Sequence, residues 1–227
     1  MQSSVITDIK KMILEKKIVS ISGESGTGKT TLACQIATFL MLDTTPYHYQ
    51  CLWVQASEYF PKKRLAIIFS KKDKEFQYIT KNIFVIPGTT IQTYQEQYDI
   101  LTKFEKKNLP PDIKIIVIDN ISHHLRYEIS QRKDINKIST IKNRFYDELL
   151  FPLIMYCQRE EIILLLLHEV SADVESGTIK PFFANLYQRI DGVSISLSKH
   201  QINGGLTMKV TNTDKRYKIV NEGLIPI

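Results

Sequence analysis

A short glycine-rich stretch constrains this chain more than any other feature of its sequence. Residues 23–30 read Gly-Glu-Ser-Gly-Thr-Gly-Lys-Thr and match the pattern G-x-x-x-x-G-K-[ST] at every position. An apolar run at residues 18–22 precedes this stretch, and a segment of helical character at residues 29–42 follows it. This order predicts a buried strand, a phosphate-binding loop and a helix, which together indicate binding of a nucleoside triphosphate.

The residue types in this loop suit phosphate chemistry. Its three glycines allow the backbone to turn tightly and to point successive N–H groups inward at an anion. The N-terminal end of the following helix adds its positive dipole. Lys29 can reach the β- and γ-phosphates, and the Thr30 hydroxyl can ligate Mg²⁺. We expect the nucleotide to be held by Gly23, Glu24, Ser25, Gly26, Thr27, Gly28, Lys29, Thr30 and Thr31.

The rest of the chain alternates apolar runs with helical patterns, which predicts an α/β fold with a mainly parallel sheet and helices on both faces. An amphipathic helix is expected within residues 1–15, and residues 170–183 are expected to form a loop. Near the end, alternating runs flank Asn203-Gly204-Gly205, which favours an antiparallel hairpin. Without linker or repeat, residues 1–227 are expected to form one domain. The expected strands are 18–22, 51–54, 83–86, 113–118, 162–167, 193–197, 206–211 and 217–220, and the other expected helices start at Pro61 or lie at 91–106, at 134–159 with an irregularity at Pro152, and at 185–190.

Two carboxylates follow predicted strands at the edge where open α/β sheets bind ligands. Asp119 follows the strand 113–118 and would hold Mg²⁺ across from Thr30; the alternative is an ordinary aspartate capping a turn. Glu58 is the one carboxylate just after the strand 51–54. We therefore expect Glu58 to position the water that attacks the γ-phosphate.

Bulk properties narrow the possible partners and location. The net charge of +6 and the pI of about 9.0 are typical either of a protein with an acidic partner such as nucleic acid or of one with a lysine-rich surface. Cys34, Cys51 and Cys157 lack metal or disulfide spacing, which predicts reduced thiols in the cytoplasm, or in the nucleus of a eukaryotic host. The N-terminus lacks a signal-peptide pattern, and the longest apolar run, 162–167, is too short to span a membrane.

Two classes of P-loop protein fit poorly. A GTPase needs an N-K-x-D guanine-binding motif, but the nearest match, residues 136–139, ends in Ser139 and lies in a predicted helix. Small-molecule kinases usually have an arginine-rich lid, whereas the seven arginines here are scattered along the chain. A third class, ATPases of the recombinase type, is left.

The chain resembles the RecA/RadA/RadB recombinase family and its KaiC-like relatives, most of all RadB-like proteins and the eukaryotic recombinase paralogues. The strand before Glu58 and the Pro-x-x-Arg-Leu helix start after it are similar to the second strand of that family. Further similarity lies in the strand ending at Asp119, in Leu167-His168-Glu169-Val170, and in the stretch that runs into the C-terminal hairpin. The segments concerned are residues 52–54, 60–65, 115–121, 125–128, 167–170 and 180–199.

The resemblance implies a RecA-type fold, ATP and Mg²⁺ as cofactors, and a role in DNA recombination and repair. It implies Lys29, Glu58 and Glu169 as catalytic residues, the last at the position of a γ-phosphate-sensing glutamine. It also implies single-stranded DNA, a recombinase protein, or both as partners, and homo- or hetero-oligomers. DNA would contact two loops, 122–134 and 170–183, and the C-terminal segment. The basic residues concerned are Arg126, Arg132, Lys180, Lys209, Lys215 and Arg216.

Departures from the family pattern qualify this picture. Alignment on Pro61 places Ser57 where the family often has its catalytic glutamate, with Glu58 one residue later. Glu169 would repel a γ-phosphate unless Mg²⁺ or a proton intervened. Only 22 residues precede Gly23, too few for the N-terminal domain of full recombinases. These departures favour a weakly hydrolysing paralogue or mediator. The alternative is a KaiC-like regulatory ATPase, gated by its nucleotide, that binds a protein instead of DNA.

Overall fold

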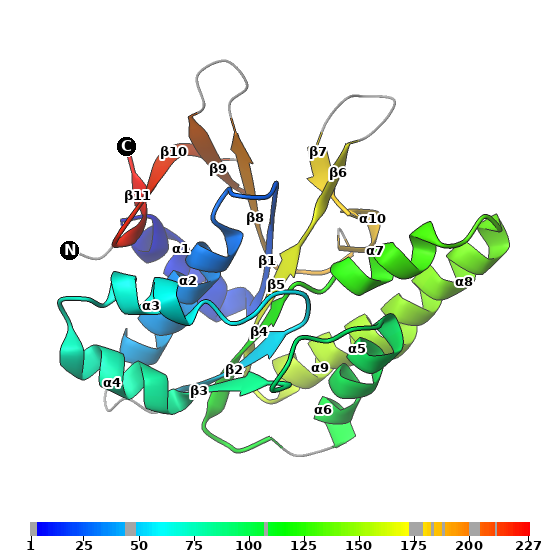
Figure 1. Cartoon of the computed structure of the whole chain (residues 1–227), viewed down its shortest axis with the longest axis horizontal. Coiled ribbons are helices and arrows are strands. Elements are labelled where there is room, and N and C mark those ends of the chain that lie inside the picture. Colours follow the sequence, from blue (N-terminus) through cyan, green and yellow to red (C-terminus); the bar gives the residue numbers. More distant parts are fainter. Residues whose placement is uncertain are drawn as a thin grey trace.

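A mostly parallel β-sheet runs through the middle of the molecule (Figure 1). The computed structural model describes residues 4–43, 49–106, 109–172, 179–182, 184–187, 189–199, 205–211 and 213–227. The described strands of this sheet have the order β11-β10-β9-β8-β1-β5-β4-β2-β3. The parallel part comprises β8 (Val193–Lys199), β1 (Ile18–Gly23), β5 (Ile163–His168), β4 (Ile113–Asp119), β2 (Gln50–Gln55) and β3 (Ile83–Ile86).

An antiparallel extension continues the sheet beyond β8. It consists of β9 (Leu206–Val210), β10 (Thr213–Val220) and β11 (Gly223–Pro226). The pairing of Lys199 with Leu206 confirms the predicted hairpin strands, although Asn203 and Gly204 of the predicted turn lie outside the described residues. The strand β11 was not predicted, because a run of four residues that contains a glycine and a proline carries little strand signal.

Helices cover both faces of the sheet, which confirms the predicted fold class (Figure 1). Strand residues alternate between the two faces: Val19 and Ile21 pack with the helices of one side, and Ile18 and Leu164 with those of the other. The first side has α1 (Ser4–Lys16) and α2 (Lys29–Asp43), with α3 (Lys62–Ile68) and α4 (Asp73–Asn82) beside them. The second side has α5 (Tyr94–Leu101), α6 (Lys103–Lys106), α7 (His123–Ser130), α8 (Ile135–Arg144) and α9 (Phe151–Arg159), and the short α10 (Ala184–Tyr187) follows near the end of the chain.

Three local predictions need correction. The predicted loop 122–134 contains the helix α7, whose buried side chains are only His124 and Leu125, so the sequence shows no apolar periodicity there. The predicted loop 170–183 contains the paired strands β6 (Val170–Ala172) and β7 (Ile179–Pro181); residues 173–178 and 183 lie outside the described part. The single helix expected after Pro61 is the pair α3 and α4.

The long helical stretch predicted for residues 134–159 is confirmed, as α8 and α9 joined by a π-helical segment, Phe145–Leu150. The irregularity thus lies just before Pro152, where a proline ring crowds the preceding turn and supplies no N–H to it. Among the helices that the structure describes, none is both long and apolar enough to cross a membrane.

Candidate nucleotide site

The loop between β1 and α2 is shaped as the sequence predicts. Gly28 has φ +90°, a left-handed conformation that side chains rarely adopt, so a glycine is required there. The Lys29 ammonium lies inside the loop and donates to the carbonyl oxygens of Gly23 (2.8 Å) and Glu24 (3.0 Å). Burial lowers the pKa of Lys29, whereas the carboxylate of Asp119 acts to raise it. These hydrogen bonds hold the Lys29 ammonium inside the loop, where it could contact a bound phosphate.

Thr30 and Asp119 meet across the site. The strand β4 ends with Asp119, and the Thr30 hydroxyl donates to its Oδ2 at 2.8 Å. Burial raises the pKa of Asp119 to about 6, against the opposing effect of the Thr30 hydrogen bond. One carboxylate beside one hydroxyl fits Mg²⁺, which usually takes few protein ligands together with phosphate oxygens. Among the described residues, no three His, Cys, Asp or Glu side chains are grouped to hold a metal on their own.

A hollow of about 550 Å³ opens in front of the loop. All three residues predicted to be catalytic line it, together with Asp119 and all of the loop residues except Thr27. Thr27 is buried beneath the loop, where its hydroxyl donates to Glu24 O at 2.8 Å. The lining is Gly23, Glu24, Ser25, Gly26, Gly28, Lys29, Thr30, Thr31, Glu58, Asp119, Asn120, Arg126, Glu169 and Val170.

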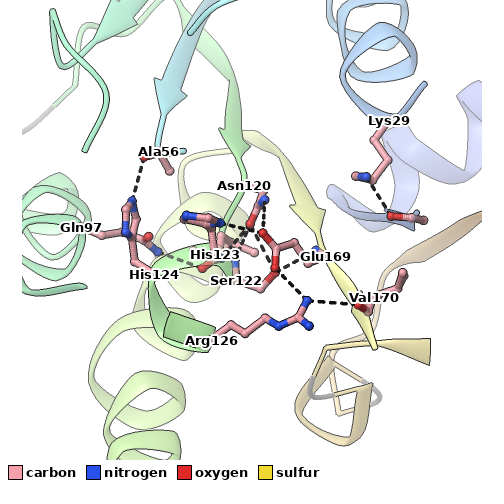
Figure 2. A network of polar contacts seen from close by, with 12 residues as sticks. Lys29, Ala56, Gln97, Asn120, Ser122, His123, His124, Arg126, Glu169 and Val170 are labelled. Carbon is pink, nitrogen blue, oxygen red and sulfur yellow. Dashed lines mark hydrogen bonds and ion pairs between the residues drawn. The ribbon is translucent and has the colours of Figure 1, made fainter. Parts of the chain in front are cut away.

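The segment that carries Glu58 is fixed by backbone hydrogen bonds to the end of β4. The N–H groups of Ala56 and Ser57 both donate to Asp119 O, at 2.8 and 3.1 Å. His124, on α7, lies 2.9 Å from Ala56 O through its Nε2 (Figure 2). Burial lowers the pKa of His124, and its contact with Ala56 joins α7 to the segment that follows β2. Glu58 lines the hollow, whereas Ser57, which aligns with the family glutamate, does not.

Glu169 stands at the centre of a polar network (Figure 2). Its Oε1 lies 2.7 Å from His123 Nδ1 and 3.5 Å from Asn120 Nδ2, and its Oε2 lies 3.1 Å from Arg126 Nη1. Its backbone N–H donates to Ser122 Oγ at 2.9 Å. Burial acts to raise the pKa of Glu169, but the bonds to His123, Arg126 and Asn120 outweigh it and hold the pKa below its ordinary value. Glu169 is therefore a carboxylate partnered by cationic and amide groups.

The structure separates the residues predicted to bind DNA. Arg126 lines the nucleotide hollow, and Arg132 pairs with Glu128 at 2.7 Å on the outer side of α7. Lys180 lines a second cavity of about 340 Å³, formed with Ile18, Tyr187 and others on the α10 side of the sheet. The other three lie on the antiparallel extension, where Lys209 faces Asp214 in the register. These three are Lys209, Lys215 and Arg216.

Sequence reasoning missed several residues that shape the site. Lys199, at the end of β8, donates to Ser25 O at 2.7 Å. Tyr217, on β10, donates to Thr27 O at 2.7 Å. His123 and Asn120 contact Glu169. Only Asn120 had a sequence signal, its position directly after Asp119; the other contacts join segments far apart in the chain.

Comparisons with known proteins agree with this geometry. The family model described as Novel STAND NTPase 3 (nSTAND3) matches residues 1–163. The DNA repair protein RAD57 of Saccharomyces cerevisiae is 27% identical over 130 residues, which are 56% of this chain and 28% of RAD57. The chain thus spans little more than a quarter of the length of that curated relative. The crystal structure of the RadB recombinase superposes with a TM-score of 0.68 at 17% identity, and the match covers 92% of this chain and 90% of that one.

These findings support the resemblance to the RecA/RadB recombinases that the sequence motifs indicated. The RadB likeness shows the RecA-type P-loop fold. The family model spans well over half of the chain, and the protein therefore belongs to the nSTAND3 family of NTPases.

Proposed function

We propose that the protein binds ATP with Mg²⁺ and hydrolyses it slowly, as a RecA-like recombinase paralogue in DNA recombination and repair. The observation that carries the proposal is the convergence of Lys29, Thr30 and Asp119 in one hollow at the carboxyl ends of parallel strands. The similarity to RAD57 and the RadB-like fold support the role in recombination. We take residues 1–227 as one RecA-like ATPase domain. Its free cysteines are buried, which suits a cytoplasmic or nuclear setting.

The loop, Lys29, Thr30, Asp119 and Glu58 each have a part in the proposed activity. The loop N–H groups and Lys29 would bind the β- and γ-phosphate oxygens and stabilise the charge that develops on them. Thr30 and Asp119 would hold Mg²⁺, which when bound neutralises phosphate charge. Glu58 would accept a hydrogen bond from the attacking water and orient it. Its segment is tied to Asp119 by backbone bonds, so Glu58 and the metal ligands keep a fixed relation.

Replacing Glu58 by glutamine is expected to lower ATP turnover at least roughly a hundredfold while ATP affinity stays within about twofold, because the amide cannot accept the water proton. Steady-state turnover and calorimetric titration measure the two effects. The Ser57→Ala variant is the control, since Ser57 lies outside the hollow. Full turnover in Glu58→Gln would make Glu58 a bystander.

Single-stranded DNA is expected to raise ATP turnover and to bind with an affinity that falls as salt rises, by roughly twentyfold between about 50 and 200 mM salt if three phosphates are neutralised. The Arg216→Glu variant should weaken this binding, because Arg216 is an exposed cation on β10. Lys63→Glu, an equal charge change on α3, is the control. If the protein does not bind DNA at low salt with or without ATP, the recombination role is ruled out.

The second candidate function is a regulatory ATPase, gated by its nucleotide, that binds a protein partner. Both arginines proposed for DNA contact on the α7 side have partners within the protein: Arg126 pairs with Glu169 and Arg132 with Glu128. This arrangement leaves less charge for phosphate neutralisation on the α7 side. The same DNA titration separates the two candidates, because a regulatory ATPase would turn over ATP without DNA binding.

A further inference from the structure

Arg126 lies between two places where negative charge gathers. On one side its Nη1 meets Glu169 Oε2 at 3.1 Å, and on the other its side chain lines the hollow that contains Lys29 (Figure 2). It comes from α7, a helix on the side of the sheet opposite α2. A guanidinium binds carboxylates and phosphates through the same planar set of donors. Arg126 is therefore paired with Glu169, and a phosphate bound in the hollow could compete with Glu169 for it.

The order of the strands shows which part of a bound nucleotide could compete with Glu169 for Arg126. The strand β5 lies between β1 and β4, and Ser22 is in register with His168, so Glu169 follows directly beside the start of the loop at Gly23. A nucleotide held by this loop and Lys29 directs its last phosphate toward the ends of β5 and β4. A diphosphate ends at the loop, whereas a triphosphate extends toward Glu169, where like charges repel.

The pairing of Arg126 with Glu169 can be exchanged at little cost. The side chains are 47% and 26% exposed, and ion pairs with such access to water are weak. Glu169 keeps a second partner in His123, at 2.7 Å, and a third in Asn120. Release of Arg126 therefore leaves no isolated carboxylate, while a phosphate that carries more charge gains a guanidinium.

We propose that Arg126 distinguishes a nucleoside triphosphate from a diphosphate by changing partners, from Glu169 to the γ-phosphate. In the absence of a γ-phosphate, Glu169 holds Arg126 in place. When the γ-phosphate arrives, Arg126 moves to it and neutralises the charge that Glu169 would otherwise repel. This inference rests on the proposed nucleotide site and adds to it the residue that reads the state of the nucleotide.

The exchange of partners by Arg126 would also affect the two-stranded ribbon formed by β6 and β7. Arg126 Nη1 lies 3.4 Å from Val170 O at the start of β6, and its guanidinium lies 5.5 Å from the centre of the Phe182 ring just after β7. Phe182 N–H in turn donates to Glu169 O at 2.8 Å. A move of Arg126 toward phosphate withdraws two contacts from the ribbon. The ribbon thus senses whether the bound nucleotide has a γ-phosphate.

The test compares the affinities for Mg²⁺–AMP-PNP, a triphosphate that is not hydrolysed, and Mg²⁺–ADP by calorimetry. Arg126→Ala is expected to weaken AMP-PNP binding by about tenfold and ADP binding by less than about twofold, because one charge-assisted contact to the γ-phosphate is lost. Arg126→Lys should recover part of the loss, since a point charge remains without the planar donors. Glu169→Gln should tighten AMP-PNP binding and leave ADP binding unchanged, because the competing carboxylate is gone.

Arg132→Ala serves as the matched control, because it removes the same charge six residues later in the chain and outside the hollow. It should leave the ratio of the two affinities unchanged. A second readout is hydrogen exchange in β6 and β7, which AMP-PNP should increase in the native protein but not in Arg126→Ala. An equal effect of Arg126→Ala on both nucleotides, or no effect on either, would overturn the inference. If the native protein binds neither nucleotide, the proposed nucleotide site itself fails.

Discussion

Replacing Lys29 by alanine is expected to weaken ATP binding by roughly a hundredfold. The Lys29 ammonium is part-buried inside the loop and bonded to two of its carbonyl groups, so it is already positioned for an anion there. Truncating one member of a buried, hydrogen-bonded charge pair costs about 3 kcal/mol, which is roughly a hundredfold in Kd. Isothermal titration with Mg²⁺–ATP measures the loss directly.

The control for this variant is Lys63→Ala, which removes an equal charge from an exposed position on α3. It should bind ATP as the native protein does, so a general effect of net charge is excluded. A denaturation curve for Lys29→Ala checks that the loop has not lost its fold with its two internal bonds. Unchanged ATP affinity in folded Lys29→Ala would remove the central claim, because the loop could then not be the nucleotide site.

The parts of the fold that were predictable are those with strong local signals. The strands β1, β4 and β5 are mostly apolar and almost entirely buried, so composition locates them. The loop between β1 and α2 follows from its residue pattern. Because parallel strands end at one edge of the sheet, Asp119 and Glu58 could be placed beside the loop without knowledge of the tertiary structure.

The rest of the site depends on contacts that no local pattern reveals. Arg126 and Glu169 are 43 residues apart, and their pairing requires α7 to lie against the end of β5. DNA contact was expected for Arg126 because the sequence shows that the residue is cationic. It does not show that the side chain points toward Glu169. Likewise the sequence showed that Glu169 would repel a γ-phosphate, whereas Arg126 and His123, which pair with Glu169, come from a segment that was expected to be a loop.

The C-terminal extension contacts the helix α2, which follows the candidate nucleotide loop. Gln35 accepts from Leu224 N at 2.7 Å and donates to the carbonyl oxygens of Leu224 and Glu222 at 3.4 and 3.3 Å. Tyr217 donates to Thr27 O inside the loop itself. The strands β10 and β11 therefore contact both the loop and the helix that follows it. Loss of these contacts should therefore lower the affinity for ATP.

Gly223→Val is accordingly expected to lower the free energy of unfolding by about 3 to 5 kcal/mol, through backbone strain and overpacking together. Gly223 has φ +114°, which a β-branched residue adopts only with strain. A Cβ at this position would lie 2.2 Å from the amide carbon of Gln35, so the bonds that hold β11 to α2 would have to break. Urea denaturation of the native and variant proteins measures the difference.

The same variant links this stability to function, because the Gln35 amide must turn away before the valine fits, and β11 then loses its hydrogen bonds to α2. Since β11 pairs with β10, a loosened β11 would weaken the contact of Tyr217 with the loop, and ATP affinity should fall even at temperatures where the variant remains folded. Gly88→Val is the matched control, since a Cβ there meets nothing within 4 Å. It should leave both unfolding and ATP binding nearly unchanged. If Gly223→Val were as stable as Gly88→Val, the packing of β11 on α2 would have to be wrong; if it were unstable yet bound ATP normally when folded, the extension would stabilise the domain without organising the nucleotide loop.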